Sequence, residues 1–306
     1  MSTIYQVTIM YDLFFCMDRN YIDLLKYVFT TFCSVHNVKD YTIHFVLYSP
    51  DNDLELEEQV KEILYGISQD YNIKCKYFIP TEHFTELIIK YEKLLFKENK
   101  VKKNNSVFGK LANWSRFFIN ELFPDVEKGL YLDLDILFNK SINDIFKTDI
   151  TNTIVAVSPH INVKGEKQIS DYITKHKAKI LESGILEKLD IEMADMNINN
   201  YNCGVMYFNF VQFKQQKILD KLMCLLDHLV NIHKFIHGGT EKIQNILIYK
   251  YSSFSVEYNS IYKYRKTNLR KNIIIHFKGI RNLSQDSNYL DLYKKIMSNS
   301  NFVLAF

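Results

Sequence analysis

The chain lacks the sequence features of secreted, membrane-spanning and disulfide-bonded proteins. No basic N-terminal stretch precedes an apolar segment with a cleavage site, and no apolar run approaches the ~20 residues that span a bilayer. The cysteines are odd in number and widely spaced, without a C-x-x-C pair, at positions 16, 33, 75, 203 and 224. This spacing argues against both structural zinc and a disulfide framework. We therefore expect a soluble, cytoplasmic protein with reduced and mostly buried thiols.

An excess of charge of one sign is also missing. The 38 Lys and Arg residues nearly balance the 35 Asp and Glu residues, giving a formal charge of +3, so nucleic acid is not an expected partner. A hydrophobic content of 47% and a charged content of 24% are typical of a globular protein. Internal repeats, low-complexity tracts and Pro/Gly/Ser linkers are absent, so at 306 residues we expect one large domain.

The first half of the chain alternates between strand and helix patterns. The strand patterns cover residues 4–11, 42–48 and 74–79, and the helix patterns cover 21–36, 51–65 and 81–98. Such alternation predicts a mostly parallel sheet with helices on both faces. Later segments predict helices over 108–122, 213–235 and 289–297 and strands over 154–157, 203–210 and 273–277, with a polar insertion over 160–200.

The most informative segment is an apolar run, residues 129–138, which contains Asp133 and Asp135. We expect a buried strand that ends on these aspartates, whose side chains share one face because they are two residues apart. Two carboxylates at one point repel each other unless a cation lies between them. A hard divalent ion, Mg²⁺ or Mn²⁺, that also binds phosphate oxygens fits this position. The alternative is a solvated turn after a strand.

Six short motifs occur in one order along the chain. They are D-R-N-Y (18–21), K-L-A-N-W-S-R (110–116), Y-L-D-L-D (131–135), N-C-G-V-M (202–206), G-G-T-E-K-I-Q-N (238–245) and H-F-K-G (276–279). Together they resemble the glycogenin-like, family 8 retaining glycosyltransferases over residues 4–285. The resemblance implies a GT-A-like α/β fold, in which a Rossmann-like, mostly parallel sheet is sandwiched by helices in a single domain. It places the catalytic domain at residues 1–285, with 160–200 as an insertion or acceptor-side helix and 286–306 as a helical tail.

The resemblance also implies a metal site and two catalytic residues. Asp133, Asp135 and His276 hold the ion, and an imidazole ligand favours Mn²⁺ over Mg²⁺, which stays possible. Taken alone, His276 beside an apolar run is more typical of a structural histidine bonded to backbone. Asn202 faces the donor sugar or the acceptor, and Glu241 stabilises an oxocarbenium-like transition state or orients the acceptor. Alternatively, Asn202 marks a strand entry and Glu241 caps a helix that starts near residue 240.

A donor site drawn from several segments is implied as well. Lys278 or Arg281 neutralises the diphosphate, and Gly279 lets the backbone approach the phosphates. Lys110 and Arg116 contact the donor, unless they are ordinary surface cations. Residues 10–12, at the end of the first strand, form the uridine pocket with residues 18–21. The expected donor-binding residues are Met10, Tyr11, Asp12, Asn20, Tyr21, Lys110, Arg116, Asp133, Leu134, Gly204, Lys278, Gly279 and Arg281.

Two segments depart from the family pattern. Thr240 and Glu241 replace the family's Asp-Gln pair, so Glu241 is expected to carry the charge that the family places one residue earlier. Residues 282–284 read N-L-S where the family has K-P-W, so the diphosphate-binding lysine is missing and Arg281 is the candidate substitute. These departures bear on the donor loop and the acceptor rather than on the metal site.

The expected activity is transfer of a hexose from a UDP-sugar, with UDP-glucose as the first candidate, to an acceptor hydroxyl with retention of configuration. The acceptor, a glycan or a protein, is not encoded in any motif, and a possible homodimer rests on the family alone. Two alternatives stay open. A non-catalytic nucleotide-sugar or glycan binder would explain the departures. A haloacid dehalogenase-like phosphatase also has a strand ending in D-x-D, but that motif lies near the N-terminus and is followed by G-D-x-x-x-D, which is absent here.

Overall fold

The computed structural model describes residues 10–50, 54–99, 108–159, 184–191, 200–233, 239–262, 269–278 and 283–300. Their largest element is a seven-stranded sheet with the order β3-β2-β1-β4-β7-β6-β8. Its strands are β1 (Tyr11–Met17), β2 (Tyr41–Leu47), β3 (Asn72–Tyr77), β4 (Lys128–Leu132), β6 (Val155–Pro159), β7 (Tyr201–Asn209) and β8 (Ser252–Ser253). Within this described sheet β7 is antiparallel to both of its neighbours, and the other pairs are parallel. The expected mostly parallel sheet is therefore confirmed.

A second, smaller sheet lies beside the first. It has the order β5-β10-β9, from β5 (Ile136–Phe138), β9 (Ser260–Ile261) and β10 (Ile274–His276). Strand β10 is antiparallel to β5 and parallel to β9. Because β4 and β5 are separated by three residues only, the chain passes directly from one sheet to the other there.

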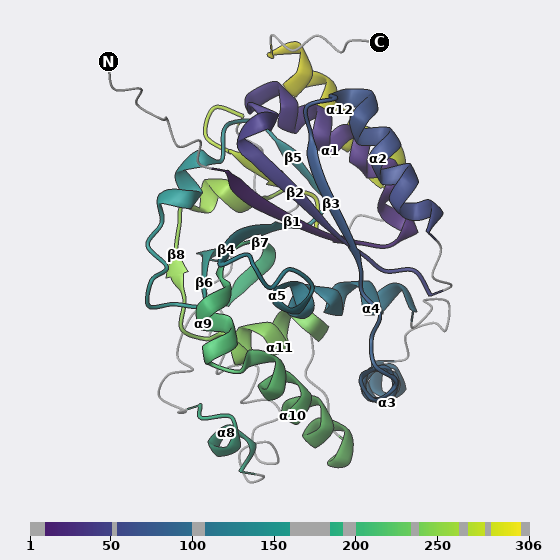
Figure 1. Cartoon of the computed structure of the whole chain (residues 1–306), viewed down its shortest axis with the longest axis vertical. Coiled ribbons are helices and arrows are strands. Elements are labelled where there is room, and N and C mark those ends of the chain that lie inside the picture. The colour runs from purple at the N-terminus through teal and green to yellow at the C-terminus, as the bar shows by residue number, and fades with distance from the viewer. Residues whose placement is uncertain are drawn as a thin grey trace.

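Helices cover both faces of the large sheet (Figure 1). One layer consists of α1 (Ile22–Val35), α2 (Glu55–Ile67) and α12 (Ser287–Ser298). The opposite layer consists of α3 (Glu82–Asn99), α4 (Phe108–Trp114), α5 (Ile119–Leu122), α9 (Phe210–Gln215), α10 (Ile218–Asn231) and α11 (Gly239–Leu247). The short helix α8 (Ile185–Lys188) lies at the lower end of the molecule, to the left of α10 in Figure 1.

Strand β1 shows why the sheet needs both layers. Its residues Leu13, Phe15 and Met17 pack on the α1 side, whereas Phe14 packs on the α4 side, and all four are fully buried. A strand that is apolar on both faces can lie only in the middle of such a sandwich. Because β1 and β4 are parallel neighbours, their C-terminal ends lie at the same edge of the sheet.

Three predicted elements differ from the structure. The first described strand is Tyr11–Met17, which pairs with β2 from Tyr11 onward, whereas the prediction was residues 4–11, of which 4–9 lie outside the described residues. The helix predicted over 108–122 is interrupted by a tighter 3-10 turn, Ser115–Phe118. The helix predicted over 213–235 is two helices, because Asn209 caps α9 and Lys217 has a left-handed backbone (φ 53°) before α10.

The expectations about membrane-spanning segments and about the cysteines can be compared with the described residues. No described helix combines the length and apolar character needed to cross a membrane. All five cysteines are free, as expected, but only Cys203 is buried and the other four are partly exposed.

A partly buried histidine makes folding stability depend on pH. His36 Nδ1–H donates to the carbonyl of Phe32 at 2.9 Å, and Nε2 accepts from the amide of Ile142 at 3.0 Å, so the ring is held neutral. Burial lowers the pKa of His36 from 6.5 to about 4. The unfolded chain therefore binds this proton first, and stability falls as pH drops below the unfolded value.

We expect His36 to reduce the free energy of unfolding by about 2 kcal/mol between about pH 7.5 and pH 5. Urea unfolding of the native chain and of His36→Gln at both pH values measures this. The variant, which has no imidazole to protonate, should lose that much less stability on acidification. Equal losses in the two proteins would show that His36 does not titrate in this way.

Candidate metal centre

Asp133 and Asp135 lie between the two sheets rather than on one strand. Strand β4 ends at Leu132, and the backbone N–H of Asp133 donates to the carbonyl of Gly204 in β7 at 2.8 Å. The carbonyl of Asp135 accepts from the N–H of Phe277, next to β10, at 2.8 Å. The prediction that the two side chains share a strand face is therefore wrong. They converge because each is held by a different sheet at the crossing.

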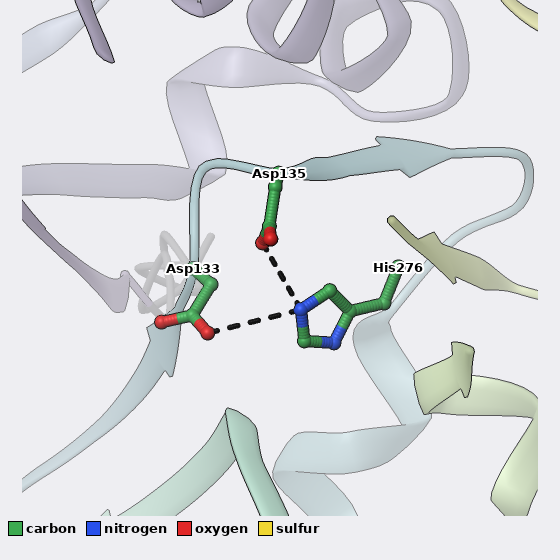
Figure 2. Close-up of side chains that lie close together, drawn as sticks. All are labelled: Asp133, Asp135 and His276. Carbon is green, nitrogen blue, oxygen red and sulfur yellow. Dashed lines mark ion pairs between the residues drawn. The ribbon is translucent and has the colours of Figure 1, made fainter. Parts of the chain in front are cut away.

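His276 completes a cluster of three metal-binding side chains (Figure 2). It is the last residue of β10 and is 1% exposed. Its Nε2 atom lies 3.0 Å from Asp135 Oδ1 and 3.8 Å from Asp133 Oδ2. The donor atoms of all three residues lie within 4.8 Å of one another, so one ion can contact them all.

The cluster passes a test of fit for a divalent cation. His276 Nε2 and Asp135 Oδ1 are both buried, and neither has a hydrogen-bond partner of good geometry among the described residues. Buried polar atoms are costly when left unpaired, and a cation between them would satisfy both. Two carboxylate oxygens and one imidazole nitrogen are a donor set suited to a divalent ion of the Mn²⁺ type.

The pKa shifts of Asp135 and His276 indicate which positive charge a metal ion would replace. Burial raises the pKa of Asp135, but the His276 imidazolium outweighs this effect and holds that pKa below its usual value. Burial lowers the pKa of His276, but the Asp135 carboxylate outweighs it and raises that pKa. Each group therefore stabilises the charged form of the other, and a metal ion would take the place of the proton.

Gly204 provides the space that the histidine occupies. A Cβ atom on Gly204 would lie 2.2 Å from His276 Cε1 and 2.9 Å from Asp133 Oδ2. Such distances are far below van der Waals contact, so only glycine fits here. The role of Gly204 in this structure is thus to let two metal-binding side chains approach β7.

One oxygen of Asp133 is already held by its neighbours. Tyr131 O–H donates to Oδ1 at 2.5 Å, and Arg116 Nη2 lies 3.6 Å from the same atom. Arg116 is 8% exposed, and its guanidinium lies 4.9 Å from the centre of the Tyr131 ring while also donating to the Cys203 carbonyl. These contacts orient Asp133 so that Oδ2 faces His276. Sequence reasoning predicted Arg116 as a donor contact and missed Tyr131, since an aromatic residue in a strand usually indicates only core.

A second polar cluster lies around Glu241. Asn202 Nδ2 donates to Glu241 Oε2 at 2.9 Å, Lys278 forms an ion pair with the same oxygen, and Lys242 Nζ lies 3.6 Å from Oε1. Glu241 is also in the first turn of α11, as its alternative role as a cap required. Its carboxylate is directed to Asn202 and Lys278, so the structure brings together three of the predicted site residues.

Asn259 connects the two clusters. Its side chain contacts His276 Nδ1 at 2.9 Å and Asn202 Oδ1 at 3.0 Å. This contact excludes the interpretation of His276 as a histidine bonded to backbone. Asn259 lies in no motif, and nothing in its sequence context could have indicated it.

The remaining predicted residues fall into four groups. Asn20 and Tyr21 follow β1 at the edge that carries the metal cluster, where Asp18 Oδ1 accepts from the Asn20 amide at 2.9 Å. Residues 10–12 lie at the start of β1, at the opposite edge, so placing them at a strand end was wrong; Asp12 pairs there with His44 at 2.6 Å, and Met10 and Tyr11 lie beside it. The Leu134 side chain is buried in the core. The Lys110 side chain, Gly279 and Arg281 lie outside the described residues.

The fold and the site define a mostly parallel α/β protein with a candidate divalent-cation site where its central strands end. Residues 12–281 match the model of glycosyl transferase family 8, and the chain belongs to that family. A putative glycosyltransferase of Haemophilus influenzae is 21% identical over 60% of this chain and 46% of its own length. Glycosyltransferase 8 domain-containing protein 1 of Danio rerio is 28% identical over 36% of this chain and 30% of its own length. The chain thus spans less than half the length of these curated relatives.

Solved structures share the fold. An active-site mutant of LgtC superimposes with a TM-score of 0.60 at 14% identity, covering 95% of this chain and 97% of that one. Galactosyltransferase LgtC in complex with donor and acceptor sugar analogues gives 0.58 at the same identity and coverage. The GT-A-like fold expected from the motifs is therefore confirmed.

Replacing Gly204 tests whether the close approach creates the metal site. Gly204→Ala should abolish Mn²⁺ binding, because the added Cβ displaces His276 from the two carboxylates. Gly66→Ala is the matched control, since a Cβ there meets nothing within 4 Å. In helix α2 that change should keep Mn²⁺ affinity and stabilise the protein by about 0.5–1 kcal/mol. Isothermal titration with Mn²⁺ and thermal unfolding measure both, and normal binding by Gly204→Ala would contradict the role given to Gly204.

Proposed function

We propose that this protein transfers a hexose, glucose first, from a UDP-sugar to an acceptor hydroxyl with retention of configuration, in a reaction that depends on Mn²⁺. The observation that carries the proposal is the cluster of Asp133, Asp135 and His276 in a chain of glycosyl transferase family 8. The complex of LgtC with donor and acceptor sugar analogues supports a nucleotide-sugar donor for a chain of this fold. Mn²⁺ is proposed over Mg²⁺ because one of the three ligands is an imidazole.

The metal cluster would bind the donor diphosphate. Asp133, Asp135 and His276 hold a divalent ion, which when bound supplies positive charge to the leaving diphosphate. Lys278 lies two residues after His276 and can neutralise the same group once it exchanges Glu241 for phosphate oxygens. Arg281 and Gly279 are proposed to contribute from the adjoining loop. Asn20 and Tyr21, at the end of β1, are proposed to contact the nucleoside side of the donor.

Asn202 and Glu241 would act on the sugar. Glu241 presents a carboxylate that is fixed by Asn202 and by two ammonium groups, so it is in place before substrate binds. A negative charge there stabilises the positive charge that develops at the anomeric carbon. The acceptor hydroxyl is proposed to attack from the face of the leaving group and to give its proton to the leaving phosphate. This order of events retains the configuration of the sugar.

The acceptor side is proposed to include residues 160–200, an insertion within the catalytic unit of residues 1–285, and the tail after residue 286. Tyr289 of α12 packs edge to face on Phe277, the neighbour of His276, with ring centres 4.8 Å apart. Helix α12 thus packs in the core against the residue that follows His276. A homodimer and a protein or glycan acceptor are part of the same proposal.

A non-catalytic nucleotide-sugar binder is the second candidate function. It is favoured by one feature, the ion pairs that occupy the Glu241 carboxylate where the family has a neutral glutamine. Turnover separates the two functions, because a binder would take up the nucleotide without releasing UDP.

UDP release from a panel of UDP-sugars, with Mn²⁺ or with EDTA, tests the proposed function. We expect release from one preferred sugar with Mn²⁺, and a loss of at least about 100-fold in Asp135→Asn, the scale of removing one charge-stabilising group. Asp144→Asn, in an exposed ion pair with Lys147, is the matched control and should keep full activity. UDP binding without release in the presence of acceptor mixtures would favour the binder. Failure to bind UDP or Mn²⁺ would refute both candidates.

Glu241→Gln distinguishes a role in the reaction from a role as a helix cap. If the carboxylate stabilises the developing charge, kcat should fall by about 100-fold while the Mn²⁺ affinity stays unchanged. A cap alone contributes about 0.3–1 kcal/mol to stability and nothing to kcat. Steady-state kinetics together with thermal unfolding decide between them, and an unchanged kcat would remove Glu241 from the mechanism.

A further inference from the structure

We infer that Asn259 is a positioning residue that fixes the tautomer and ring orientation of His276 and links this metal ligand to the Asn202–Glu241 pair. The inference rests on the proposed function for the identity of the bound ion and the substrate. It concerns a residue to which neither the family motifs nor the metal-binding pattern gives a role.

Asn259 is built into the site and has little freedom to move. It is 7% exposed and is the last residue of a 3-10 turn, Val256–Asn259, that leads directly into β9. Strand β9 pairs in parallel with β10, with Ser260 opposite Ile275 and Ile261 opposite His276. The backbone pairing therefore sets the distance between Asn259 and the imidazole.

The direction of every hydrogen bond in this group follows from one backbone amide. The N–H of Gly204 can only donate, and it lies 3.0 Å from Asn202 Oδ1, so this side-chain atom is the carbonyl oxygen. The Asn259 atom 3.0 Å from Asn202 Oδ1 must then be the donor Nδ2. Its Oδ1 is left facing His276 Nδ1 at 2.9 Å and can only accept. His276 therefore carries its proton on Nδ1.

The Glu241 end of this hydrogen-bond network gives the same direction independently. The Glu241 carboxylate can only accept, so the Asn202 atom that lies 2.9 Å away is Nδ2, in agreement with the assignment from Gly204. Two fixed ends thus determine the orientation of both amides between them. Every donor in this network therefore faces an acceptor without the reversal of any hydrogen bond.

The consequence for the metal site is that Nε2, the nitrogen directed at the two carboxylates, is the one whose proton an ion would replace. A proton on Nδ1 leaves the lone pair of Nε2 free for an ion, and that atom is the one that lies near Asp133 and Asp135. A hydrogen bond from the second ring nitrogen orients a metal-binding histidine and raises its basicity, and losing it typically costs about 10–100-fold in metal affinity. Asn259 is the residue that supplies this bond.

On the sugar side, Asn259 orients Asn202, which in turn orients Glu241. Asn202 is held by Asn259 on one amide atom and holds Glu241 with the other. Removing the Asn259 donor would leave Asn202 Oδ1 held by the Gly204 amide alone and would loosen the hold of Asn202 on Glu241. A change at Asn259 should therefore affect turnover as well as metal affinity, although it touches neither substrate nor ion.

Two substitutions separate the two halves of this role. Asn259→Ala removes the acceptor for His276 and the donor for Asn202 together. Asn259→Asp keeps an oxygen opposite His276 Nδ1–H but places a second carboxylate oxygen opposite Asn202 Oδ1, where a donor is required. Asn209→Ala is the matched control, because Asn209 is similarly buried, at 5% exposed, and caps α9 at the opposite end of β7.

The experiment measures Mn²⁺ affinity from the electron paramagnetic resonance signal of the free ion, with circular dichroism to verify folding. We expect Mn²⁺ to bind about 10–100-fold more weakly to Asn259→Ala than to the native chain. Asn259→Asp should bind it at least as tightly as the native chain while its kcat for UDP release falls, and Asn209→Ala should change neither quantity.

Three results would contradict the inference. Native Mn²⁺ affinity in Asn259→Ala would overturn it and leave the proposed function intact. Equal weakening in Asn259→Asp and Asn259→Ala would show that the residue acts through packing rather than through the hydrogen bond to His276. A native chain that binds no Mn²⁺ would overturn the inference and the proposed metal site together.

Discussion

The repulsion between Asp133 and Asp135 is the constraint on which the rest of the site depends. Backbone hydrogen bonds hold one aspartate to β7 and the other beside β10, so the backbones that carry the two carboxylates are fixed close together. Tyr131 and Arg116 offset the charge on one oxygen of Asp133. His276 offsets the other side of the pair as an imidazolium, until an ion replaces its proton. Every neighbouring group therefore compensates negative charge at one point, as a divalent-cation site requires.

Much of the fold could be predicted from the sequence because the interior strands and amphipathic helices repeat simple patterns. The strand over 42–48, for example, is apolar on both faces and is observed as β2, and the helix over 21–36 is observed as α1. The prediction was wrong where tertiary contacts determine the bounds of an element. No glycine or proline marks the division of the 129–138 run, yet it separates into β4 and β5 because its two halves pair with different sheets. Only the three-dimensional arrangement shows that the crossing itself forms the site.

The candidate site was predictable to the extent that its residues lie in motifs. Asp133, Asp135 and His276 were named from the family resemblance, and the structure brings their donor atoms together. Asn259 was missed because its partner Asn202 lies 57 positions away, a separation that no local pattern can bridge. Tyr131 was missed although its partner Asp133 lies two residues away, because an aromatic residue in a strand usually indicates only core. Residues 10–12 were placed at the wrong edge of the sheet, since an error in the bounds of one strand reverses the end at which its residues lie.

The central claim is that one divalent ion binds between these three side chains and carries the diphosphate of the donor. Crystals soaked with Mn²⁺ and UDP, measured at the manganese absorption edge, test it most directly. The account predicts a single strong anomalous peak in contact with Asp133, Asp135 and Nε2 of His276, with diphosphate oxygens completing the coordination. An ion bound to the diphosphate alone, or to other side chains, would contradict it.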